Sequence, residues 1–100
     1  ERGRVGVGIE NVNEQMAKEL GLSKAQGVVI VQVEKDSPAA QAGLRVGDVV
    51  LKINGSTVES IRDFARFVGE NKPGTRLQLE IWREGHSEQK ELVVGQSASR

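Results

Sequence analysis

The chain of 100 residues and 10.8 kDa has the length of one domain, and its 14 basic and 14 acidic residues cancel to zero net charge. The neutral charge and the three aromatic residues argue against nucleic-acid binding, which needs a basic face and stacking side chains. The absence of cysteine and the single histidine exclude thiolate and multi-histidine sites, so we expect no metal and no cofactor. The apolar runs are far shorter than the ~20 residues that cross a bilayer, and no signal peptide opens these residues, so no direct membrane insertion is expected.

The first half of the chain alternates predicted strands with short helices. Residues 3–9 alternate valine and isoleucine with glycine, which predicts a strand. A helix is predicted over 13–21, where an asparagine N-cap is followed by an apolar face and a terminal glycine. The β-branched run 27–33 predicts a strand buried on both faces, and Ser-Pro at the start of 37–43 predicts a helix that ends at the glycine. Residues 48–53 predict a strand closed by an Asn-Gly turn.

The second half contains the clearest helix and a hairpin. A serine N-cap, an early aspartate and an apolar stripe predict a helix over 60–71. Strands are predicted over 77–82 and 91–94, with a turn at 84–86 between them. Five strands with a few short helices in a chain of this length predict a small β-rich α+β barrel or sandwich.

The glycine-rich start of the chain is the first candidate binding site. The backbone amides of Val5, Gly6 and Val7 would hold a carboxylate, because N–H groups in a concave turn bind an anion without a side chain. Phosphate binding is disfavoured, since the glycines lie before and inside a strand and no Gly-Lys-Ser/Thr motif follows. A plain tight turn into an edge strand remains the structural alternative.

A helical stripe is the second candidate. Ile61, Ala65 and Val68 are spaced to share one face of the predicted helix. In one interpretation all three belong to the core. In the other they line a groove, because Phe64 and Phe67 already supply bulky groups on the adjoining side. The residues alone leave both interpretations open.

The chain shows no catalytic arrangement. His86 is expected to be an exposed turn residue, and no G-x-S-x-G elbow accompanies it. The surrounding charges are of mixed sign and predict a solvated hairpin face; they belong to Arg83, Glu84, Glu88, Lys90 and Glu91. We therefore expect a binding domain that performs no covalent chemistry.

Three segments together resemble a PDZ domain: R-G-R-V-G-V at 2–7, S-P-A-A-Q-A-G-L at 37–44 and V-G-D-V-V-L-K-I-N-G at 46–55. The order of elements resembles the circularly permuted bacterial topology, and the early helix and the hairpin are similar to those of the Do-like (HtrA) periplasmic serine proteases. The resemblance implies an α+β, β-rich fold, a PDZ-like five- to six-stranded partly open barrel or sandwich capped by two or three helices. Residues 1–95 would form the PDZ domain and 96–100 a linker or tail.

The resemblance also implies where a ligand binds. The residues implied to hold a peptide carboxylate are Arg4, Val5, Gly6 and Val7. Those implied to line the peptide groove are Gly8, Ile9, Ile61, Ala65 and Val68. Because Ile61 stands at the first groove-helix position in place of histidine, an apolar residue is expected third from the ligand's end. A bulky residue in place of Gly6 is expected to abolish binding and leave the fold intact, since the carboxylate needs close backbone approach.

The function implied by the resemblance is that of a non-catalytic peptide-binding module. It would capture the C-terminus, or an extended strand, of substrate or partner proteins by β-augmentation and present it to, or regulate, an attached serine protease domain. Expected partners are C-terminal peptides of unfolded or envelope proteins with an apolar last residue. The parent would be a periplasmic homo-oligomer engaged in protein quality control. The alternative is a protomer–protomer assembly module with a closed or empty groove.

Overall fold

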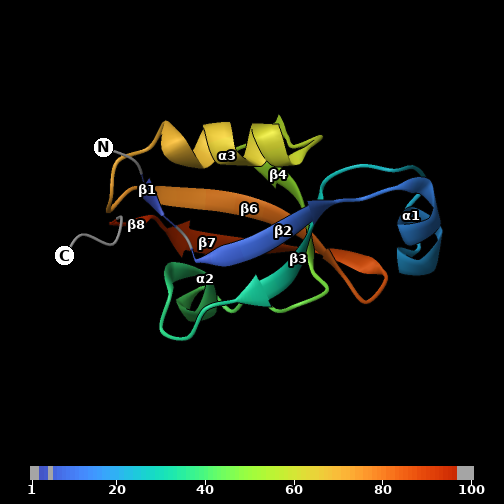
Figure 1. The fold of residues 1–100 in the computed structure, drawn as a ribbon, viewed down its shortest axis with the longest axis horizontal. Coiled ribbons are helices and arrows are strands. Elements are labelled where there is room, and N and C mark those ends of the chain that lie inside the picture. Colours follow the sequence, from blue (N-terminus) through green and yellow to red (C-terminus); the bar gives the residue numbers. More distant parts are fainter. Residues whose placement is uncertain (1–2, 5, 97–100) are drawn as a thin grey trace.

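A computed structural model describes residues 3–4 and 6–96 (Figure 1). The strands are β1 (Gly3–Arg4), β2 (Val7–Asn11), β3 (Val28–Val33), β4 (Val49–Ile53), β5 (Ser56–Thr57), β6 (Arg76–Arg83), β7 (His86–Val93) and β8 (Gly95–Gln96). The helices are α1 (Glu14–Leu20), α2 (Pro38–Gln41) and α3 (Ile61–Gly69). None of the helices in this part of the chain is long and apolar enough to cross a membrane.

All strand pairs are antiparallel, and most of them belong to one sheet. Its order is β2-β3-β4-β6-β7, with β5 paired to β4, while β1 and β8 form a separate two-stranded sheet. This architecture confirms the predicted β-rich α+β fold with a few helices. The circular permutation remains a prediction, and so does the domain boundary at residue 95, although β8 pairs as far as Gln96.

The helices begin at the residues that the sequence predicts. The side-chain oxygens of Asn13, Ser37 and Ser60 each accept a hydrogen bond from the backbone N–H three residues later, at 2.8, 3.1 and 3.3 Å. These bonds satisfy N–H groups that the first turn of a helix leaves without a partner. Gly21 ends α1 with a φ of +82°, a conformation that glycine adopts without steric cost.

The two faces of the large sheet carry separate apolar clusters. The main core lies under α2 and α3 and includes Val28, Ile30, Ala39, Val50, Val58, Phe64, Val68, Leu77, Leu79, Ile81 and Leu92. The outer cluster lies under α1 and includes Val12, Ala17, Leu22, Val29, Val49 and Leu51. In Figure 1, α3 and α2 flank β2 on opposite sides, and α1 lies at the end of the domain away from β1 and β8.

Two strand predictions need correction. The predicted strand 3–9 is two strands, because the chain turns at Gly6, where φ is +77°. The run 27–33 is buried on both faces only in its first half, since the outer cluster ends before Val31, whose side chain is 44% exposed. Val31 is also the extra residue of a β-bulge. Gly8 pairs with Gln32, whereas the next residue of β2, Ile9, pairs with Ile30, so the register skips Val31.

The hairpin of β6 and β7 is not solvated throughout, so that expectation is wrong for Arg83. Only 11% of its side chain is exposed, and its Nε and NH2 donate to the two carboxylate oxygens of Asp48 at 2.8 and 2.6 Å. The same NH2 donates to the carbonyl oxygen of Gly43 at 2.8 Å. The hydrogen bond to Asp48 is the main cause that raises the pKa of Arg83. The guanidinium therefore ties the hairpin to the segment that precedes β4.

Candidate functional site

The candidate site is the edge of the large sheet formed by β2. Within the described residues β2 pairs with β3 alone, and its other edge faces α3 (Figure 1). The carbonyl oxygen of Gly6 accepts a hydrogen bond from the N–H of Glu34, which follows β3, at 2.9 Å. Because antiparallel residues alternate in the strand to which they bond, the N–H and C=O groups of Val7 and Ile9 are directed at the free edge.

The side chains of β2 alternate between the two faces of the sheet. Val7 and Ile9 are half-buried and pack against the main core, so they lie on the face that α3 covers. Gly8 and Glu10 lie on the opposite face, where Val29, the partner of Glu10, belongs to the outer cluster. A strand added along β2 would meet apolar side chains on one face and a glycine and a carboxylate on the other.

The apolar stripe predicted on α3 consists of two exposed residues and one buried residue. Ile61 and Ala65 are exposed, Ile61 to 39%. Val68 is only 7% exposed and packs in the main core together with Phe64. Ile61 and Ala65 are thus accessible to a ligand, whereas Val68 supports the helix from below. That these residues contact a peptide remains a prediction.

Gly6 is held more tightly than the sequence indicates. It is buried, and a Cβ added there would overlap the Cβ of Ser37 and lie 2.9 Å from its Oγ. Ser37 is fixed in turn, because its hydroxyl donates to the carbonyl oxygen of Glu34 at 2.7 Å and caps α2. The expectation that a bulky substitution at Gly6 leaves the fold intact is therefore wrong. Of the other predicted carboxylate-binding positions, the side chain of Arg4 and the whole of Val5 lie outside the described residues.

A hydrogen bond that the sequence analysis missed joins β2 to α3. Asn11 Oδ1 accepts a hydrogen bond from the backbone N–H of Ile61 at 2.8 Å, which links the last residue of β2 to the first residue of α3. The bond lies beside a hollow lined by Asn11, Glu59, Ser60, Arg62 and Asp63. Fifty sequence positions separate its two partners, and no local pattern marks such a pair.

His86, the single histidine, lies on β7 at the opposite edge of the sheet from β2. It is exposed, and its Nε2 is 3.1 Å from Oε2 of Glu88. This hydrogen bond is the main cause that lowers the pKa of Glu88, with smaller contributions from Arg83 and Lys90. The described part of the chain contains no group of three or more acidic, histidine or cysteine side chains able to hold a metal ion.

Related sequences place this geometry in a family. A family model described as PDZ domain matches residues 3–94. Over 94 residues the chain is 44% identical to a probable periplasmic serine endoprotease, DegP-like, of Pseudomonas fulva (strain 12-X), and 42% identical to its counterpart in Rhizobium meliloti (strain 1021). These alignments cover 94% of this chain and 20% and 19% of the relatives, so the chain spans about a fifth of their length. The expected periplasmic setting agrees with the names of these relatives.

Solved structures share the fold. The HtrA-type protease AlgW with a decapeptide matches with a TM-score of 0.86 and 30% identity, over 99% of this chain and 30% of that one. The HtrA3 PDZ domain bound to a phage-derived ligand (FGRWV) matches with a TM-score of 0.78 over 94% of this chain and 85% of that one; at 20% identity it shows the common fold. The resemblance to HtrA-type proteases is thus confirmed. The chain belongs to the PDZ domain family and is a non-catalytic module of it.

Proposed function

We propose that the domain captures the free C-terminus of another protein chain by adding it as an antiparallel strand to β2. The observation that carries this proposal is the free edge of β2, whose backbone groups at Val7 and Ile9 are directed toward α3. Backbone pairing binds many sequences, because every peptide offers the same N–H and C=O groups. The similar HtrA-type protease AlgW is described with a decapeptide, which supports peptide binding as the function.

The carboxylate fixes the register of the bound strand. It lies against the backbone amides of Val5, Gly6 and Val7, so the last residue of the peptide lies opposite Val7 and the third-last opposite Ile9. Both side chains point to the α3 face of the sheet, where the exposed Ile61 and Ala65 are apolar neighbours. An apolar last residue and an apolar third-last residue are therefore preferred. Affinities on the order of micromolar or weaker follow, because little area is buried and the peptide must be ordered.

The role of this C-terminal capture is inferred from the larger proteins to which the chain is related. The curated relatives are named periplasmic serine endoproteases, and this chain corresponds to about a fifth of their length. The domain belongs to a periplasmic protease, binds the C-termini of unfolded or envelope proteins, and presents them to the protease domain or regulates it.

A peptide titration tests the proposal. A fluorescently labelled hexapeptide that ends in a free apolar residue is titrated with the domain by anisotropy, beside a twin whose C-terminus is amidated. Binding of the free acid that is lost in the amide supports capture of the carboxylate. No binding of either peptide at millimolar domain, together with self-association in sedimentation, would contradict the proposal and favour the assembly module.

A further inference from the structure

Four residues of β2 and β3 lie next to the free edge, on the face of the sheet that carries the outer cluster. Gly8, which has no side chain, is paired with Gln32, and Glu10 is paired with Val29. Val29 is buried in the outer cluster, and Gln32 is exposed and uncharged. Glu10 is therefore the one charged side chain among these four positions of the ladder.

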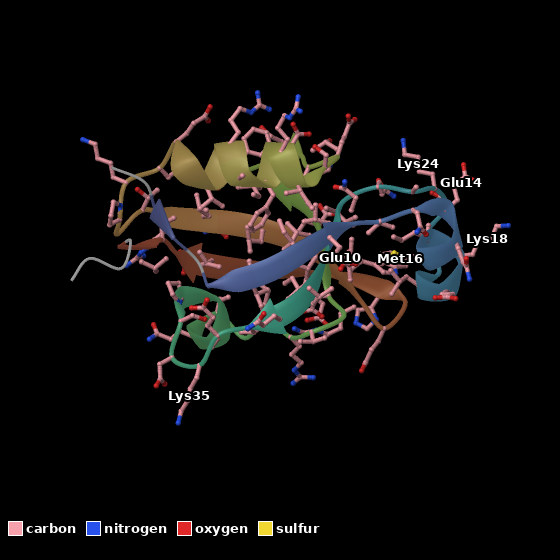
Figure 2. The ribbon with its side chains drawn as sticks, in the orientation of Figure 1. Glu10, Glu14, Met16, Lys18, Lys24 and Lys35 are labelled. Atoms are coloured by element: carbon pink, nitrogen blue, oxygen red, sulfur yellow. The ribbon has the colours of Figure 1, made fainter. Side chains whose placement is uncertain are left out.

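Glu10 has no partner within the described part of the chain. Its carboxylate is exposed and makes no hydrogen bond or ion pair there. Figure 2 shows Glu10 on β2 near the middle of the domain, whereas Lys35 lies near α2 and Lys18 lies on α1 at the far end. The net charge of the chain is zero, so an overall charge does not hide the attraction or repulsion that Glu10 exerts on a ligand side chain. Glu10 thus presents an unneutralised negative charge beside the edge that receives the ligand.

The register of the bound strand places one ligand residue opposite this carboxylate. With the last ligand residue opposite Val7, antiparallel pairing puts the fourth-last residue opposite Glu10. Side chains of directly opposed residues lie on the same face, about 5 Å apart at Cβ, so opposite charges there attract. Resting on the proposed function, we propose that Glu10 selects ligands with lysine or arginine as the fourth-last residue.

The test uses two hexapeptides that differ only at the fourth-last residue, lysine in one and glutamate in the other, each ending in the same free apolar residue. At low salt the wild-type domain is expected to bind the lysine peptide about two- to fivefold more tightly. Glu10→Lys is expected to reverse this order, and Glu10→Gln to bring the two affinities together. Glu19→Lys, on the exposed surface of α1, makes the same change in net charge and is expected to keep the wild-type preference.

The outcomes separate this inference from the proposed function. If both peptides bind equally well to the wild type and still require a free carboxylate, the role of Glu10 is wrong and C-terminal capture stands. If Glu19→Lys changes the preference as much as Glu10→Lys, net charge is the cause and the inference is also wrong. If neither peptide binds, both proposals fall.

Discussion

Asn11 Oδ1, at the end of β2, accepts a hydrogen bond of 2.8 Å from the backbone N–H of Ile61, at the start of α3. These two elements are the sides between which the proposed peptide strand lies. The bond fixes their separation at one end, and it satisfies an N–H group that the first turn of α3 leaves without an intrahelical partner. The strand edge and the helix are therefore coupled by one exposed side chain.

Asn11→Ala is expected to lower both stability and peptide affinity. Loss of the bond to Ile61 costs about 1 kcal/mol of unfolding free energy, as for other side chains that satisfy the first turn of a helix. Affinity falls by up to about fivefold, because the freed helix end must be fixed again when the peptide binds. Denaturant unfolding and peptide titration measure the two effects.

Asn13→Ala is the matched control for this variant. Asn13 makes the same kind of bond at the start of α1, to the backbone N–H of Met16 at 2.8 Å, away from the free edge of β2. A similar loss of stability with unchanged affinity is expected. Equal losses of affinity in both variants would show that Asn11 acts through general stability alone.

Gly6→Ala is expected to destabilise the domain more than Gly55→Ala. Both glycines have positive φ, +77° and +84°, so each substitution carries a backbone strain of roughly 1–2 kcal/mol. Only at Gly6 does the new Cβ also overlap Ser37, whereas nothing lies within 4 Å of it at Gly55. The difference in unfolding free energy between the two variants measures this overlap. Equal values would contradict the tight packing of Gly6 on Ser37.

The regular elements of this fold follow from local patterns, and the missed strands do not. The caps at Asn13 and Ser60 are recognisable because each polar residue directly precedes an apolar helical face. The first half of β7 is a polar edge strand, so its residues do not alternate between apolar and polar. The sequence therefore predicts only the end of this strand, from residue 91. β5 and β8 are two residues long and exist through their partners alone.

The candidate site was predictable in its backbone and not in its long-range contacts. The glycines around Val7 mark a strand that another backbone can approach, which needs only local sequence. The bonds from Asn11 to Ile61 and from Arg83 to Asp48 join residues 50 and 35 positions apart. A charge such as that of Arg83 looks solvated in the sequence, because its buried partner becomes a neighbour only when β6 pairs with β4.

Arg83→Met is expected to be strongly destabilising. The methionine keeps an apolar stem, but it removes the guanidinium from the carboxylate of Asp48, whose side chain is 3% exposed. That carboxylate then keeps the hydrogen bond from the backbone N–H of Arg45 and loses those from Arg83. Removing one partner of a buried pair costs about 3 kcal/mol. Arg76→Met removes an exposed pair with Glu91 at 4.0 Å and should cost less than about 0.5 kcal/mol. Equal losses in denaturant unfolding would contradict the role of the buried pair.

Glu88→Gln is expected to change how stability depends on pH. Its hydrogen bond with His86 lowers the pKa of Glu88 below the ordinary value of 4.5, so the ionised form stabilises the folded state. This contribution is complete above pH 4.5 and is lost as the pH falls through the lowered pKa. Unfolding measured from neutral to acidic pH should show the variant less stable at neutral pH and equal to wild type in acid. A difference that persists in acid would contradict this cause.

The most direct test of C-terminal capture is an NMR titration of the isotope-labelled domain with a short peptide ending in a free apolar residue, beside its amidated twin. The account predicts shifts for the free acid that cluster at residues 6–9 and along α3, and that the amide does not produce. Equal shifts from both peptides would contradict carboxylate recognition, and shifts confined to other surfaces would contradict binding at the edge of β2.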